Sequence, residues 1–235
     1  MRHLLFATLL IATSASAQVP AVRPPVGQGE AGDWAYIGRY RADNATLPAP
    51  TARRVVFMGD SITQGWATQP FLASGPDLVG RGISGQTAPQ MVVRFRTDVV
   101  DLMPRVVHIM AGTNDVAGNT GAESDAEIQN YIADMVELAQ AHHIGVVLAS
   151  IPPAADFPWR PTPGVVDRIK GLNGWIKVYA ASHHAVYADY WPVLATSAGA
   201  MKPEYSKDGV HPNADGYAAM APIARAAVDR AIRMR

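Results

Sequence analysis

The chain has 235 residues, in which 20 basic side chains balance 20 acidic ones, so the formal net charge is zero. That length suits one domain with a well-filled core. No basic face for nucleic acid or for an anionic membrane surface stands out, and the balance favours a small, neutral substrate. The absence of cysteine excludes disulfides, thiolate metal sites and a cysteine nucleophile.

The first 17 residues have the pattern of a signal peptide. Arg2 precedes an apolar run at residues 4–12, and residues 15–17 form a small-residue cleavage site. The apolar run is far shorter than the ~20 residues that a membrane-spanning helix needs. We therefore predict export to a periplasm or the medium after cleavage near Ala17, without stable insertion into a membrane.

Residues 18–52 are predicted to be a leader and linker, because residues 19–29 and 46–52 are rich in proline, glycine and alanine. Between these stretches, residues 33–43 predict a short helix packed on the domain. The rest of the chain, residues 53–235, is predicted to form that domain.

Apolar runs and helical patterns alternate through the domain. Runs of apolar residues, typical of strands covered on both faces, predict strands at residues 54–58, 78–83, 106–111, 145–151 and 185–188. Apolar residues at helical spacing predict helices over 128–139, 165–179 and 217–231, although Gly171 and Gly174 weaken the second. The alternation indicates an α/β fold, in which helices cover both faces of a parallel sheet.

Polar side chains stand in small-residue turns after the predicted strands. Ser61 follows the first strand and Asn114 the third, while Asp208 and His211 lie in a loop beyond the last. Ligands of open parallel sheets bind beyond the carboxyl ends of the strands. We therefore expect a site that draws on these turns.

A reactive serine needs a base within hydrogen-bond reach, and the base needs an orienting partner. Among the seven histidines, His211 fits best, because Asp208 three residues earlier can hold Nδ1 and leave Nε2 for Ser61. The alternative for this pair is an ordinary turn with an incidental helix cap. His108 lies in an apolar run and is expected to be a core residue. Four other histidines are expected to lie at helix ends: His142, His143, His183 and His184.

Acyl transfer also needs convergent hydrogen-bond donors for the oxyanion. The Ser61 N–H is one candidate. Gly85 is a second, because a residue without Cβ lets the backbone approach a substrate, and the Asn114 side chain is a third. Each has a simpler alternative, since glycine is common in turns and asparagine caps helices.

Four stretches follow one another in the domain: Gly59-Asp60-Ser61-Ile62, Gly82-Ile83-Ser84-Gly85, Gly112-Thr113-Asn114-Asp115 and Asp208-Gly209-Val210-His211-Pro212. In this order they resemble the blocks of the SGNH hydrolase superfamily, also called GDSL-type esterases and lipases. Ile62 stands where leucine is commoner. The finer resemblance is to exported, acetylesterase-like members from bacteria.

This resemblance implies a three-layer α/β/α, flavodoxin-like fold around five parallel strands. It implies Ser61 as the nucleophile, His211 as the base and Asp208 as the orienting carboxylate. The Ser61 and Gly85 N–H groups and the Asn114 side chain would then form the oxyanion hole. No metal or organic cofactor is implied. Asp60 is expected to hold the serine turn by bonding nearby backbone.

We therefore expect a serine ester hydrolase that removes short acyl groups, acetyl especially, from a carbohydrate or small alcohol. Candidate substrate-binding side chains follow the fourth and fifth strands: Phe157, Trp159, Arg160 and Trp191. The alternative is that they only pack the loop at residues 151–163 and its neighbours. An acyltransferase, a lysophospholipase or thioesterase, and a non-catalytic carbohydrate-binding domain also stay open. No nucleic-acid partner is expected, and the sequence does not indicate the oligomeric state.

Overall fold

The computed structural model describes residues 32–234. The predicted signal peptide, residues 1–17, and the first part of the predicted leader, residues 18–31, lie outside this range. Within it, no helix combines the length and the apolar character that crossing a membrane requires.

Five parallel strands form the central sheet in the order β2-β1-β3-β4-β5. Their bounds are β1 Val55–Gly59, β2 Leu78–Gly82, β3 Val106–Met110, β4 Gly145–Ala149 and β5 Val186–Ala188. Each agrees with its predicted range to within two residues at either end. The order is the flavodoxin-like one, in which the ligand crevice opens beyond the carboxyl ends of the adjacent strands β1 and β3, because the connections that follow these two strands leave to opposite sides. The predicted fold class is thus confirmed.

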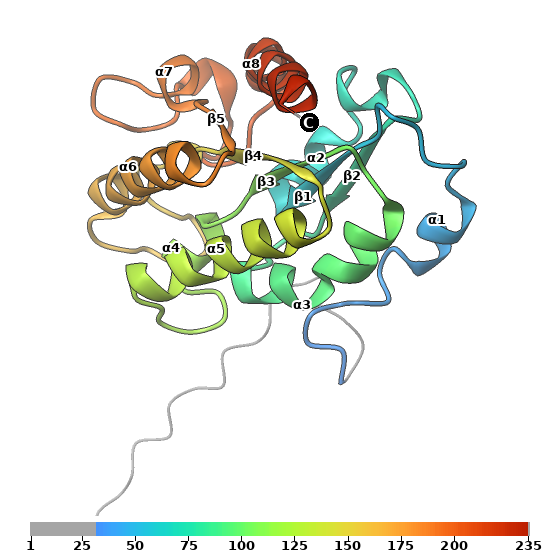
Figure 1. Cartoon of the computed structure of the whole chain (residues 1–235). Coiled ribbons are helices and arrows are strands. Elements are labelled where there is room, and N and C mark those ends of the chain that lie inside the picture. Colours follow the sequence, from blue (N-terminus) through green and yellow to red (C-terminus); the bar gives the residue numbers. More distant parts are fainter. Residues whose placement is uncertain (1–31, 235) are drawn as a thin grey trace, which may run out of the picture.

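Helices cover both faces of the sheet, as Figure 1 shows. The α-helices in the described part of the chain are α1 Arg41–Thr46, α2 Ser61–Trp66, α3 Ala88–Asp98, α4 Thr113–Val116, α5 Asp125–Ala141, α6 Val165–Ser182, α7 Trp191–Leu194 and α8 Ala214–Arg233. One apolar core unites α3, α5 and α6 with the sheet, and a second unites α2, α7 and α8 with it. The architecture therefore has three layers, α/β/α.

The helices begin and end where local chemistry favours it. Ser124 and Glu127 form a capping box before α5, in which the Glu127 carboxylate accepts the Ser124 N–H at 2.7 Å. His142 and His183 stand directly after α5 and α6, and the residue after each, His143 or His184, has a positive φ that turns the chain toward the next strand. The expectation for these four histidines is confirmed.

The segment before the sheet differs from its prediction. The helix expected over residues 33–43 is a series of turns followed by α1, which starts only at Arg41. The Asp33 carboxylate accepts the backbone N–H groups of Ile37 and Gly38 at 2.9 and 3.0 Å, and Tyr36 has a φ of +52°. These bonds and this left-handed residue favour turns over a helix.

Candidate active site

The serine turn connects β1 to α2. Asp60 caps α2, because its Oδ1 accepts the Ile62 N–H at 2.9 Å, so the expected structural role of Asp60 is confirmed. Gly59 permits the close approach of strand and helix, since a Cβ there would lie 2.1 Å from Thr63 Oγ1 and 2.9 Å from the Met110 carbonyl oxygen. Ser61 is therefore the first residue of the helix, at its positive N-terminal end.

Two side chains of a loop about 150 residues later, His211 and Asp208, meet Ser61 at this turn. Ser61 Oγ lies 2.8 Å from His211 Nε2, and His211 Nδ1 lies 2.7 Å from Asp208 Oδ2. A carboxylate facing Nδ1 favours the tautomer with its proton on that nitrogen, which leaves Nε2 as an acceptor for the serine hydroxyl. The arrangement can move a proton from Ser61 to His211.

A tight loop holds the carboxylate of Asp208. Its Oδ1 accepts the backbone N–H groups of His211 and Val210 at 2.8 and 3.0 Å, and the Ser206 hydroxyl at 3.0 Å. Partial burial acts to raise the pKa of Asp208, but the hydrogen bonds from His211 and Val210 outweigh it, and the pKa lies below its ordinary value. Asp208 is therefore a fixed negative charge beside the imidazole.

The candidate oxyanion donors gather beside the serine turn. Gly85, between β2 and α3, has a φ of +79°, and Asn114, in α4 after β3, is buried. Asn114 Nδ2 lies 3.0 Å from the Gln86 carbonyl oxygen and 3.3 Å from Asp60 Oδ2. The amide nitrogen of Asn114 is thus directed toward the serine turn and the loop of Gly85.

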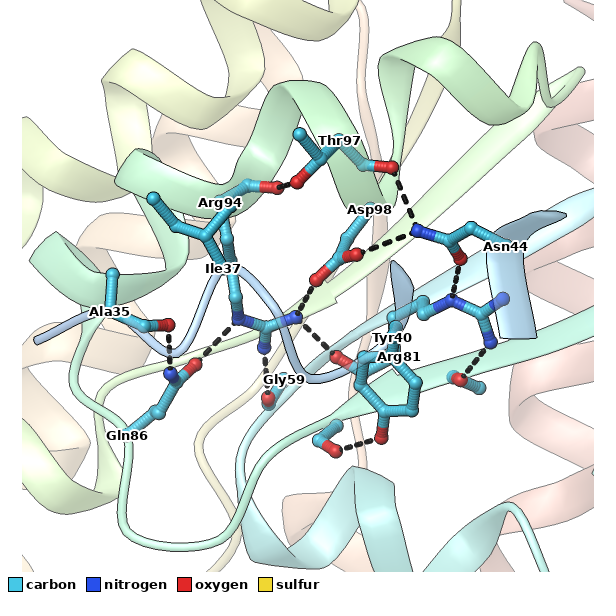
Figure 2. Close-up of polar contacts among 12 residues, drawn as sticks. Ala35, Ile37, Tyr40, Asn44, Gly59, Arg81, Gln86, Arg94, Thr97 and Asp98 are labelled. Carbon is cyan, nitrogen blue, oxygen red and sulfur yellow. Dashed lines mark hydrogen bonds and ion pairs between the residues drawn. The ribbon is translucent and has the colours of Figure 1, made fainter. Parts of the chain in front are cut away.

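A buried arginine of α3, Arg94, lies behind both turns (Figure 2). Its Nη2 donates to the Gly59 carbonyl at 2.9 Å, and its Nε donates to Gln86 Oε1 at 2.6 Å. Gly59 comes two residues before Ser61, and Gln86 directly follows Gly85. One cationic side chain therefore joins the serine turn to the turn that carries a candidate oxyanion donor.

The segment of residues 33–46 packs against the same region, as Figure 2 also shows. The Tyr40 hydroxyl donates to the Gly82 carbonyl, and Gln86 Nε2 donates to the Ala35 carbonyl at 2.7 Å. Both hydrogen bonds are buried. This part of the predicted leader is therefore in contact with the loop that contains Gly85.

The candidate substrate-binding residues lie in different surroundings. Phe157 is fully buried in the core, so its side chain packs the loop, as the simpler alternative held. Trp159 is 44% exposed, and its ring centroid lies 5.9 Å from that of His211. Arg160 and Trp191 are half-buried, and Trp191 packs against the core near Gly199. Of these four candidates, Trp159 thus combines an exposed side chain with a ring beside His211.

His108 is a fully buried core residue, as expected. It stacks on Phe57 with ring centroids 4.8 Å apart, and its Nε2 lies 2.8 Å from the Tyr190 hydroxyl. Burial lowers the pKa of His108 to about 3, so the ring is neutral. Elsewhere in residues 32–234, no three His, Asp or Glu side chains gather where they could hold a metal ion.

Three polar residues that support the site were not identified from the sequence: Gln86, Arg94 and Asn119. The sequence does place Gln90, Arg94 and Asp98 at intervals of four, which puts three polar side chains on one side of a helix. In the structure all three are buried. Asn119 gave a weaker signal, since it stands between two glycines in the loop after α4.

Comparisons with known proteins agree with this fold. A family model described as the GDSL-like lipase/acylhydrolase family matches residues 57–219. The crystal structure of a GDSL-like lipase from Bacteroides thetaiotaomicron VPI-5482 is similar, with 42% identity and a TM-score of 0.81, over 84% of this chain and 98% of that one. A structure from Bacteroides fragilis NCTC 9343 has 43% identity and a TM-score of 0.82, over 86% of this chain and 99% of that one.

Two further matches give weaker evidence about this chain. An acetylxylan esterase from Geobacillus stearothermophilus shares 19% identity with a TM-score of 0.61, over 77% of this chain and 95% of that one, which shows a common fold alone. The uncharacterized lipoprotein YqeF of Bacillus subtilis (strain 168) is 35% identical over 80 residues. That match spans 33% of this chain and 33% of the lipoprotein's own length.

Proposed function

Because the chain belongs to the GDSL-like lipase/acylhydrolase family, we propose that it hydrolyses carboxylic esters through a covalent acyl-enzyme on Ser61. Membership supports an enzyme that acts on esters in general. The observation that carries the proposal is the pair of contacts at His211, 2.8 Å to Ser61 Oγ and 2.7 Å to Asp208 Oδ2. These are the distances at which a nucleophile, a base and an orienting carboxylate work as a unit.

In the first step, His211 Nε2 takes the hydroxyl proton as Ser61 Oγ attacks the ester carbonyl carbon. The carbonyl oxygen becomes an oxyanion, and the imidazolium is stabilised by Asp208. The tetrahedral intermediate then collapses, the alkoxide leaves with the proton from Nε2, and an acyl-serine ester remains. Water repeats the sequence with the same proton route, which releases the carboxylic acid and restores Ser61.

The proposed oxyanion hole consists of the Ser61 and Gly85 N–H groups and the Asn114 amide. Asn114 Nδ2 has two hydrogens and, in the structure, two protein acceptors at 3.0 and 3.3 Å. The longer contact, to Asp60 Oδ2, is the weaker one by geometry. We propose that an oxyanion replaces it, so that the amide keeps its bond to Gln86 and turns one hydrogen to the substrate.

For the substrate we propose a short acyl group, acetyl above all, on a carbohydrate or small alcohol. The exposed ring of Trp159 beside His211 supports a leaving group with a flat, weakly polar face. Turnover of acetate, butyrate and octanoate esters of one alcohol tests the acyl preference. A falling series supports the proposal, and preference for octanoate contradicts it.

The central test replaces the nucleophile. Ser61→Ala, with folding checked by circular dichroism, is expected to lower the turnover of a chromogenic acetate ester by about 10⁴-fold or more. Ser182→Ala, an exposed serine at the end of α6, is the matched control and is expected to keep full activity. A serine-directed phosphonate should label the natural chain at Ser61. Full activity of Ser61→Ala would remove the proposal.

The same experiments separate the alternatives. Added alcohol or sugar reveals an acyltransferase if the acyl group passes to it rather than to water. The absence of both turnover and phosphonate labelling would favour a non-catalytic binding domain. Export is proposed on residues 1–17 alone, and N-terminal sequencing tests it: a chain starting near Gln18 supports export, and one starting at Met1 in the cytoplasm contradicts it.

A further inference from the structure

The buried side-chain amide of Asn119 contacts two residues of the proposed oxyanion hole, the side chain of Asn114 and the backbone of Gly85. Its Nδ2 donates to Asn114 Oδ1 at 2.7 Å and to the Gly85 carbonyl at 3.2 Å. Asn119 is 7% exposed, and its remaining polar atom, Oδ1, accepts the indole N–H of Trp159 at 3.1 Å. Every polar atom of the side chain therefore has a partner in or beside the site.

These bonds decide which way the Asn114 amide points. An asparagine amide can place its oxygen and nitrogen in either of two orientations. The donor Asn119 Nδ2 requires the Asn114 oxygen on its side, so the Asn114 nitrogen must face Asp60 and Gln86. Without that donor, the Asn114 amide loses the shortest of its three hydrogen bonds and the one that holds its oxygen away from the serine turn.

Trp159 extends this chain of contacts to the surface. Its indole N–H fixes the Asn119 oxygen, its ring lies against His211, and nearly half of its area is exposed. The fully buried Phe157 packs against the indole, with the two ring centroids 5.3 Å apart. A group stacked on the exposed indole face would thus contact the residue that sets the Asn119 amide.

We propose that Asn119 is the positioning residue of the oxyanion hole and that Trp159 is a specificity-determining residue coupled to it. The preferred leaving group is an alcohol with an apolar ring face, such as a pyranose, which stacks on the indole while the Trp159 N–H holds Asn119. This inference rests on the proposed function, since it needs a hydrolysis that passes through an oxyanion at Ser61.

The first test is Asn119→Asp, which keeps the size of the side chain and the acceptor for Trp159 but places a carboxylate against two oxygen acceptors, Asn114 Oδ1 and the Gly85 carbonyl. We expect kcat on ethyl acetate and on an acetylated pyranoside to fall about equally, by ~10–100-fold, with KM within about threefold. That is part of the ~10²–10³ that loss of a whole oxyanion donor costs. Phosphorylation of Ser61 by diethyl p-nitrophenyl phosphate, which releases p-nitrophenolate, should slow in proportion, because its phosphoryl oxygen occupies the same hole.

The second test separates the two parts of Trp159. Trp159→Phe keeps a ring and loses the N–H, so kcat should fall several-fold for both esters. Trp159→Ala also loses the stacking surface, so KM should additionally rise for the acetylated pyranoside but not for ethyl acetate. The matched controls are Asn130→Asp, exposed on α5, and Trp175→Phe on α6, both with unchanged kinetics.

The outcomes are distinguishable. If Ser61→Ala is inactive while Asn119→Asp and Trp159→Phe keep kcat within twofold of the natural chain, the inference is wrong and the proposed function stands. If Ser61→Ala is fully active, the proposed function itself is wrong. A purely structural role would lower the urea midpoint of Asn119→Asp and leave kcat of the folded protein intact, which also overturns the inference. Should Asn119→Asp fail to fold, the Trp159 pair decides alone.

Discussion

Arg94 Nη2 lies 2.9 Å from the carbonyl oxygen of Gly59, so a buried cation holds the peptide two residues before the candidate nucleophile. The same guanidinium donates to Gln86 Oε1 and to the Arg81 carbonyl, and it pairs with Asp98 (Figure 2). Both members of the ion pair are fully buried. Burial of a charge is costly unless the charge is paired and hydrogen-bonded, and here both conditions are met.

We predict that Arg94→Met lowers the free energy of unfolding by ~3–5 kcal/mol. The substitution leaves the Asp98 carboxylate buried without its cation and removes the donor from the Gly59 carbonyl. Urea denaturation measures the effect. Arg96→Met, which changes an exposed arginine on the same helix, is the control and should shift the free energy by less than about 0.5 kcal/mol.

The double variant Arg94→Met/Asp98→Leu measures how much of the effect comes from leaving the Asp98 carboxylate without its cation. Removing both partners leaves no uncompensated charge, so the double variant should be more stable than Arg94→Met alone. A double variant that loses the sum of two large single effects would show that the contribution of Arg94 comes from its backbone bonds rather than from the pair.

A second prediction concerns Tyr40, in the segment that precedes the family match at residues 57–219. The buried Tyr40 hydroxyl donates to the Gly82 carbonyl at the end of β2, and Tyr40→Phe leaves that oxygen without this donor. We expect a loss of ~1–2 kcal/mol in the free energy of unfolding. Tyr36→Phe, half-buried in the same segment, serves as control, and equal effects of the two would contradict the prediction.

The strands and three long helices could be predicted because their apolar residues recur at the spacing of the element. The flavodoxin-like order of the strands followed from a resemblance carried by four short stretches, each in a turn beyond a strand. The pairing of Ser61 with His211 and Asp208 was already suggested by the turns themselves. Helix α3 was not predicted, since Gln90, Arg94 and Asp98 interrupt its apolar pattern while being buried. Buried polar residues look like surface residues until their partners are known.

The supporting residues of the site were hidden for the same reason. Asn119 acts through contacts with Trp159 and Asn114, 40 and 5 residues away, and nothing local to Asn119 distinguishes it from an ordinary loop asparagine. The segment of residues 33–46 also depends on distant partners, because Tyr40 bonds a residue 42 positions later. Long-range hydrogen bonds of single polar side chains leave no periodic signal.

A third prediction uses a glycine that weakened the prediction of helix α6. Gly171 is exposed, and a Cβ there would meet no heavy atom within 4 Å. Gly171→Ala should therefore raise the free energy of unfolding by ~0.5–1 kcal/mol, which for a chain of this size is a rise of ~1–4 °C in Tm. Calorimetry measures the change in Tm.

The contrasting variant is Gly82→Ala, which should be strongly destabilising, since its Cβ would lie 2.1 Å from Gln64 N and 2.6 Å from the Asp60 carbonyl oxygen. Equal responses at the two sites would contradict the argument.

The last prediction concerns pH and the buried carboxylate of Asp60. Burial raises the pKa of Asp60 from 3.8 to about 6, although the Ile62 N–H, His211 and Arg94 act in the opposite direction. A pKa that is higher in the folded state means that folding favours the protonated form. The natural chain should therefore lose roughly 3 kcal/mol from this group as pH rises from about 4 to about 6, and no more above that.

Asp60→Asn removes this titration and keeps an oxygen that can cap α2. The difference in free energy of unfolding, variant minus natural chain, should therefore rise between pH 4 and pH 6 and stay level above about pH 7. An altered contact with Asn114 shifts the free energy of unfolding of the variant by an amount that does not depend on pH. The quantity to measure by urea denaturation is therefore the change of this difference with pH. Asp208→Asn is the opposite control: the pKa of Asp208 is lowered from 3.8 in the folded state, so its difference should fall as pH rises toward about 4 and stay level above about pH 5. A level difference for Asp60→Asn from pH 4 to 7.5 would mean that Asp60 is ionised in the fold as readily as in water, and that its bonds to Ile62 and Asn114 fully offset its burial.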